Sequence, residues 1–488
     1  MNSSRRIRNA LGVGLALWAV NVTAAQHSIL IGGGYELAAS QAQIELNLGW
    51  VKDILESRGE EPRVYYTDGD DPAPDVFWHD TLSEDALALE PLARVFGMHY
   101  LQGEQYRNHG LQNVIDTTQR DVLEPALAAH LSALGEGDEV LLVYNGHGAP
   151  STGREDEVAL KLWGDTRMSA AALQDLLDTS LDSAVPLRYV FTQCYSGGFH
   201  RLIYADSAAG QDLSKPLRCG FTAESPWRQS EGCSASIELG DYRDYTTFFF
   251  AALKGEDRLG RPLLSNPDQD QDGKTTMFEA HLYTLEHAHS TDLSRASSEV
   301  YLEQQVPFYM NWMSFPDTLP DNPYGALAAR LAARLDVPTD AIVGTARARL
   351  ATLRRQHLEQ REEQRANREE GERLRVELQA QLLKHYPQLA LPYTGAYLAL
   401  LTGQAASVQS WIQSQSTFPA LVQKQDAEAA FALNLLNLER DIAQIEKLIR
   451  LRRLAFYLAW LTEKGDETLQ ADYARLLACE SAPLTKTP

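Results

Sequence analysis

Cysteine is scarce in this chain, with four among 488 residues. So few thiols exclude a small scaffold stapled by disulfides. The four are Cys194, Cys219, Cys233 and Cys479. For Cys219 and Cys233 two alternatives stay open: a disulfide closing a short loop, or two free, partly buried thiols. Cys194 is expected to stay unpaired, because the pattern around it is that of a reactive thiol.

Positive charge is also in short supply. Lysine and arginine number 44 against 66 aspartates and glutamates, a formal net charge of -22. Binding to a phosphate backbone needs clustered cations, so nucleic acid is excluded as the main partner. The glycines of residues 32–34 follow an apolar run but lack the GxGxxG spacing. That absence excludes a dinucleotide-binding loop.

Long apolar runs are missing beyond the N-terminus, so no later segment is expected to span a membrane. At the N-terminus, Arg5, Arg6 and Arg8 precede an apolar stretch over residues 10–20, and small residues precede Gln26. This order predicts a signal peptide over residues 1–25 and a secreted or periplasmic mature protein. An uncleaved anchor is the alternative.

Two apolar runs of strand length carry the chemistry. Residues 139–148 (EVLLVYNGHG) end in His147 and Gly148, and residues 187–198 (LRYVFTQCYSGG) contain Cys194. Strand ends of a parallel sheet converge at its carboxyl edge, where an imidazole can activate a thiol. Backbone N–H groups of Gly148 and Cys194 are candidate oxyanion donors. The pair predicts a catalytic dyad, although either residue alone would favour a structural role.

Strand-like and helix-like segments alternate over the first two thirds of the chain. Expected strands cover 27–32, 63–66 and the two runs above; expected helices cover 40–57, 117–134, 169–181 and 241–254. This alternation predicts an α/β fold with a mostly parallel sheet flanked by helices. We expect a catalytic domain over residues 26–320 and an all-α, partly coiled-coil-like domain over 321–488, where glycine and proline thin out.

The C-terminal part contains a long helical pattern over residues 340–384 and an apolar seam further on. The seam residues recur at spacings of four and three: Phe431, Leu435, Leu438, Ile442, Ile445 and Ile449. Such a seam packs against another helix. The expected partner is the 340–384 helix of the same chain, lying antiparallel. Self-association as a homodimeric coiled coil is the alternative.

Residues 268–279 (DQDQDGKTTMFE) match the EF-hand loop pattern D-x-D-x-D-G-x5-E. Oxygens at alternating positions converge on a hard cation, with glycine at the sharp turn. The expected ligands are Asp268, Asp270, Asp272, the carbonyl of Lys274, Thr276 and Glu279. The loop predicts a structural Ca²⁺ site, and an acidic turn before a helix is the alternative. No cofactor is expected for catalysis.

Several of these segments resemble the caspase-like cysteine peptidases. They are residues 147–150 (HGAP), 160–173, 193–197 (QCYSG), 222–224 (TAE), 230–233 (SEGC) and 239–242 (LGDY). The resemblance covers roughly residues 27–315 and is greatest to the legumain-type asparaginyl endopeptidases. It implies a dyad of His147 and Cys194.

The resemblance also implies substrate-binding roles. Ser230 would contact the substrate backbone, Asp241 would line the S1 pocket, and Thr192 stands where legumains have an acidic residue. Ala39 and Ser40 replace an arginine and a histidine that legumains carry after the first strand. The implied residue at P1 is therefore asparagine or a basic residue.

Together these observations predict a thiol endopeptidase acting on a protein or peptide substrate. Two alternatives remain. One is a catalytically silent scaffold that binds partners through its C-terminal helices. The other is a transpeptidase or ligase of the same family, in which an amine resolves the acyl-enzyme.

Overall fold

The computed structural model describes residues 25–80, 89–97, 103–151, 153, 157–205 and 212–484. The predicted signal peptide therefore lies outside the described residues except for Ala25. The strands are β1 (Gln26–Gly33), β2 (Arg63–Tyr66), β3 (Val76–His79), β4 (Glu104–Arg107), β5 (Val114–Asp116), β6 (Glu139–Ala149), β7 (Ala159–Leu162), β8 (Thr166–Ser169), β9 (Leu187–Phe191), β10 (Arg218–Thr222) and β11 (Arg295–Ala296). The helices are α1 (Ala42–Glu56), α3 (Glu90–Phe96), α4 (Arg120–Leu131), α5 (Ala170–Ser180), α6 (Tyr245–Lys254), α7 (Met277–His287), α8 (Ser297–Gln305), α9 (Pro323–Arg334), α10 (Ile342–His385), α11 (Gly395–Ser414), α12 (Phe418–Lys464) and α13 (Glu467–Glu480).

The central sheet has the strand order β11-β10-β9-β6-β1-β2-β5. Neighbours from β10 to β5 are parallel, and β11 is antiparallel to β10. The chain starts at β1, runs outward through β2 to β5, and returns to β6 on the other side of β1. The crevice beside β1 and β6 is thus a topological switch point, where open α/β sheets bind ligands.

Both faces of the central strands are covered. All five residues of β9 and residues 139–146 of β6 are buried, as continuous apolar runs in a parallel sheet should be. Two groups of helices pack with the sheet, α4 with α5 and α1 with α6 and α7. The predicted α/β fold with a mostly parallel sheet is confirmed, and the predicted strands and helices are found within a few residues of their expected bounds.

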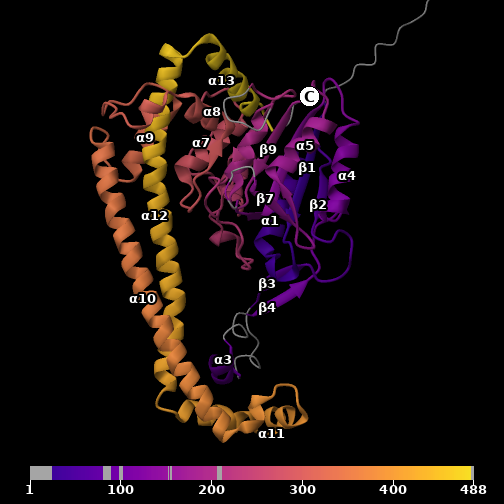
Figure 1. Ribbon diagram of the computed structural model, residues 1–488, viewed down its shortest axis with the longest axis vertical. Helices are drawn as coiled ribbons and strands as arrows, with labels where there is room; N and C mark the ends of the chain where they lie inside the picture. Colours follow the sequence, from indigo (N-terminus) through magenta and orange to yellow (C-terminus); the bar gives the residue numbers. More distant parts are fainter. Residues whose placement is uncertain are drawn as a thin grey trace, which may run out of the picture.

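The C-terminal helices form a second region, in which α10 and α12 run antiparallel as a long hairpin beside the α/β part (Figure 1). Ile442 and Ile445 of the seam pack with Ala346 and Leu353 of α10. The predicted intrachain pairing is therefore confirmed. We call this hairpin with α11 at its far end the arm. Its far end also holds α3, because Val95 is buried in the apolar cluster there.

The chain then returns to the α/β part through α13. A disulfide joins Cys219 of β10 to Cys479 of α13, and the Glu480 carboxylate accepts hydrogen bonds from Ser297 and Ser298 of α8. Within the described part of the chain, no helix combines the length and the apolar character needed to cross a bilayer.

Candidate functional site

His147 lies near the end of β6, beyond the part that pairs with β1 and within the part that pairs with β7. The glycines beside it are required by packing. A Cβ on Gly146 would lie 2.7 Å from the carbonyl oxygen of Gly33, and one on Gly148 would lie 1.9 Å from that of Cys194. Glycine therefore lets the ends of β1, β6 and β9 come together, as the two predicted motifs require.

Two acceptors hold the His147 ring in one orientation. Its Nε2 lies 2.8 Å from the carbonyl oxygen of Ala39 and 2.9 Å from Oε1 of Gln41, both in the segment after β1. A carbonyl can only accept, so Nε2 carries the hydrogen and Nδ1 carries the free lone pair. Burial lowers the pKa of His147, and the Lys161 cation lowers it further. The resting imidazole is therefore neutral and ready to accept a proton at Nδ1.

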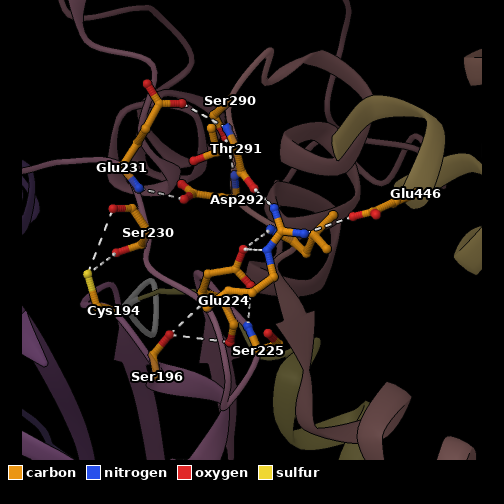
Figure 2. Close-up of polar contacts among 12 residues, drawn as sticks. Cys194, Ser196, Glu224, Ser225, Ser230, Glu231, Ser290, Thr291, Asp292 and Glu446 are labelled. Atoms are coloured by element: carbon orange, nitrogen blue, oxygen red, sulfur yellow. Dashed lines mark hydrogen bonds and ion pairs between the residues drawn. The ribbon is translucent and has the colours of Figure 1, made fainter. Parts of the chain in front are cut away.

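Cys194 follows β9 on a tight turn, where Tyr195 adopts the left-handed conformation at φ 61°. Its sulfur lies 3.9 Å from the carbonyl oxygen of Ser230 and 3.8 Å from its hydroxyl (Figure 2). Burial raises the pKa of Cys194, while the contacts with Ser230 oppose that rise. The resting sulfur is accordingly a thiol and not a thiolate.

The thiol in contact with His147 is that of Cys233, whose sulfur lies 3.7 Å from Nδ1. Cys233 is a free cysteine, because Cys219 pairs with Cys479 instead. Cys219 is therefore neither bonded to Cys233 nor free, so both alternatives were wrong for Cys219, whereas the alternative of a free thiol holds for Cys233. Burial raises the pKa of Cys233 strongly, and the nearby Cys194, Asp244 and Asp292 raise it further.

The three predicted substrate-binding residues lie in different surroundings. The side chain of Thr192 is buried and donates a hydrogen bond of 3.1 Å to the carbonyl of Tyr144. Ser230 lies against Cys194, and its role in substrate binding stays a prediction. Asp241 is exposed in a short 3-10 turn.

Asp244, three residues beyond Asp241, is one of the buried acids near the site, and Asp292 is another. The Asp244 carboxylate accepts hydrogen bonds from Gln43 at 2.9 Å and from Asn47 at 3.0 Å. A Cβ on Gly232 would lie 3.3 Å from the Cβ of Asp244, so this acid lies beside the segment that carries Cys233. Sequence reasoning missed Asp244, Cys233 and the acceptors on residues 39 and 41. The 230–233 segment was the available signal for Cys233.

The acidic loop before α7 forms a separate cluster. Asp268, Asp270 and Glu279 place carboxylate oxygens within 4.8 Å of one another. Asp268 accepts the backbone N–H of Gly273 at 2.9 Å, which folds the loop as a cation site requires. Asp272 lies outside this cluster and accepts the N–H of Lys274.

Two of the predicted ligands, Thr276 and Glu279, also cap the N-terminus of α7. Thr276 is its N-cap, and Thr276 and Glu279 form a capping box. Glu279 also accepts the N–H of Gln269 at 2.7 Å. A cation at the cluster would therefore compete with these backbone donors for the Glu279 oxygens.

Comparison with known proteins adds little. No protein-family model matches the sequence, and no curated protein matches it significantly. Among solved structures, the chain is similar to the crystal structure of protein GSU0716 from Geobacter sulfurreducens, with 14% identity and a TM-score of 0.28. The match covers 47% of this chain and 82% of that one. At this TM-score the likeness carries no argument about function.

Proposed function

We propose that this chain is a cysteine endopeptidase of the caspase-like type, with Cys194 as nucleophile and His147 as general base and acid. The observation that carries the proposal is the meeting of β6 and β9, where the backbone of Gly148 lies against the carbonyl of Cys194. The fixed His147 ring supports it, since Nε2 is held by Ala39 and Gln41 and Nδ1 remains able to accept a proton from a thiol.

In the proposed reaction the Cys194 sulfur attacks the carbonyl carbon of the scissile bond, and the thiol proton passes to Nδ1 of His147. Backbone N–H groups of Gly148 and Cys194 hold the oxyanion. Collapse of this intermediate breaks the C–N bond, and the proton on Nδ1 goes to the leaving amine. Water then hydrolyses the thioester and restores the thiol.

Two arguments favour Cys194 over Cys233 as the nucleophile. Cys194 lies on the turn directly after β9, at the carboxyl edge where a substrate carbonyl can meet backbone N–H groups. Burial and Asp292 disfavour the thiolates of both residues, but Asp244 acts in addition against that of Cys233, whereas the contacts with Ser230 favour that of Cys194. Cys233 is then a neighbour of the dyad that can donate its S–H to Nδ1 in the resting enzyme.

The preference at P1 stays a prediction of asparagine or a basic residue. The buried carboxylate of Asp244 already accepts hydrogen bonds from Gln43, Asn47 and Thr247, so the exposed Asp241 stays the proposed residue of the S1 pocket. Secretion or a periplasmic location also stays a proposal. The Cys219–Cys479 disulfide supports it, since such bonds persist in oxidising compartments.

The proposal is tested with a fluorogenic peptide library varied at P1, using the chain from residue 26 with Ca²⁺ present. Cys194→Ala is expected to lower kcat/KM by about 10³-fold or more. The matched variant Cys233→Ser should lower it by less than about tenfold, because it removes a neighbour and not the nucleophile. Activity that survives in Cys194→Ala, or is lost only in Cys233→Ser, would contradict the assignment. Inactivity of the wild type would favour the scaffold alternative.

We also propose that Asp268, Asp270 and Glu279 hold a structural Ca²⁺. Added CaCl₂ should raise the Tm of the wild type. At a hundredfold excess over Kd, the free energy of unfolding should increase by about 2.7 kcal/mol. Asp270→Asn should abolish that rise, since a carboxylate in the cluster is lost. Asp272→Asn removes the same charge outside the cluster and should reduce the rise less. Equal responses of the two variants would contradict this ligand set.

A further inference from the structure

The segment of residues 228–231 determines what surrounds the Cys194 thiol. The carbonyl of Arg228 accepts the backbone N–H of Tyr195, next to the nucleophile, at 2.8 Å. Two residues on, Ser230 touches the sulfur with both its carbonyl and its hydroxyl, and that hydroxyl is 3.0 Å from the carbonyl of Thr192. A small shift of this segment would therefore change the environment of the thiol.

Side chains of the arm hold this segment in place. The guanidinium of Arg440, on α12, is 2.5 Å from Oε1 of Glu231. The guanidinium of Arg228 is 2.9 Å from the carboxylate of Glu446, also on α12. Glu446 also binds Arg354 of α10 at 2.7 Å. The Arg440–Glu231 pair is largely buried, with side chains 13% and 16% exposed. Glu446 is 19% exposed, while its partners Arg228 and Arg354 are more open to solvent.

A second set of contacts supports the segment from the α/β side. Glu231 accepts the N–H of Thr291 at 2.8 Å and donates its own N–H to Asp292 at 2.8 Å. Arg228 also pairs with the buried Glu224 at 3.2 Å. The segment therefore lies between the α/β part and α12, with its ends held from both sides.

The position of α12 is itself fixed against the α/β part. Gln444 and Lys447 both donate to the carbonyl of Ala288, at 2.7 and 2.9 Å. Arg450 pairs with Glu299 and Glu303, both at 2.9 Å. A helix fixed in this way can transmit its own placement to Glu231 through Arg440.

We propose that α12 is a built-in part of the thiol site, with Arg440 and Glu446 acting as positioning residues for the 228–231 segment. The inference rests on the proposed function only in that Cys194 is the reacting thiol. It makes α12 a component that the site needs.

The test measures the rate at which Cys194 is alkylated by iodoacetamide in the full chain, with the modified residue identified by mass spectrometry. Arg440→Glu places two carboxylates together and should slow alkylation of Cys194 at least fivefold. The double variant Arg440→Glu with Glu231→Arg restores opposite charges and should recover the rate to within twofold of the wild type. Arg440→Lys keeps the charge without the two-pronged geometry and should fall between.

The matched control is Arg368→Glu, which makes the same charge change in the arm. Arg368 is on α10 and pairs with Glu428 of α12, away from the 228–231 segment. Its alkylation rate should stay within twofold of the wild type. If Arg440→Glu folds and alkylates like Arg368→Glu, or the double variant recovers nothing, the inference is wrong. If Arg440→Glu does not fold, the comparison of Arg440→Lys with the wild type decides in the same way.

Alkylation reports on the thiol whether or not the chain cleaves peptides. An absence of peptidase activity together with a slowed and rescued alkylation would therefore reject the proposed function and keep this inference. Peptidase activity that depends on Cys194, with alkylation unaffected by Arg440→Glu, would support the proposed function and reject this inference.

Discussion

The two halves of α12 are held in very different ways. From Ile442 to Leu461 the helix is largely buried, and its charged side chains find partners in the α/β part. From Phe418 to Asn437 it runs along α10, and the ion pair there between Arg368 and Glu428 is more exposed. One continuous helix thus joins a structural anchor to a spacer. The 228–231 segment contacts it at the junction of the two, around Arg440 and Glu446.

The largest expected effect comes from the anchored half. Arg450→Met removes the cation that serves Glu299, whose side chain is fully buried, and Glu303. Burial would raise the pKa of Glu299, but Arg450 and, to a lesser degree, His281 hold it down at about 2. Loss of Arg450 leaves the buried carboxylate with His281 and the backbone N–H of Ala296 but without its strongest cationic partner. We expect a loss of about 3–5 kcal/mol in the free energy of unfolding by urea.

The double variant Arg450→Met with Glu299→Gln serves as the control, because it removes the Glu299 carboxylate together with the Arg450 cation. It should recover part of the loss. If the free energy of unfolding of Arg450→Met lay within about 1 kcal/mol of the wild-type value, the half of α12 from Ile442 to Leu461 would not be the anchor described above.

An intermediate effect is expected at the end of the chain, where α13 returns. Burial raises the pKa of Glu480 to about 8 from an ordinary value of 4.5, although Ser297 and Ser298 oppose the rise. A raised carboxyl pKa stabilises the fold fully below pH 4.5, and that contribution is lost as the pH rises through 8. The wild type should therefore lose stability relative to Glu480→Gln as the pH rises from 5 to 8.

Urea unfolding of both proteins at pH 5, 6, 7 and 8 measures this difference, and all other titrating groups cancel in the comparison. Parallel stability curves would contradict the raised pKa of Glu480. A difference that grows with pH would sharpen the contrast between the buried contacts of the returning chain and the exposed contacts of the arm.

The smallest effect is expected in the spacer half. Arg368→Gln breaks the pair with Glu428, in which the two side chains are 68% and 31% exposed. Exposed pairs of this kind contribute about 0.2–1 kcal/mol, and salt screens them. Thermal unfolding at low and high ionic strength should show a small difference at low salt that fades at high salt. A loss as large as that of Arg450→Met would erase the distinction between the two halves.

The sequence predicted those features that depend on short-range pattern. The strands β1, β6 and β9 are continuous apolar runs, and they place His147 and Cys194 at one edge because parallel strands end together. The seam of α12 was predicted for the same reason, since its spacing matches a helix face.

Other features depend on contacts between residues far apart in the sequence, and no local pattern records them. Cys219 pairs with Cys479 across a separation of 260 residues, because α13 packs on β10. Cys233 reaches His147 because its loop crosses the carboxyl edge of the sheet, and Arg440 reaches Glu231 only through the tertiary placement of α12. Such encounters follow from topology and cannot be inferred from the residue types alone.

The central claim is that Cys194, and not the thiol beside His147, attacks the substrate. The most direct measurement is labelling of the full chain with a peptidyl acyloxymethyl ketone, followed by mass-spectrometric mapping of the adduct. The account predicts one adduct on Cys194 that disappears in His147→Ala and persists in Cys233→Ser. An adduct on Cys233, or labelling of Cys194 that is unchanged in His147→Ala, would contradict it.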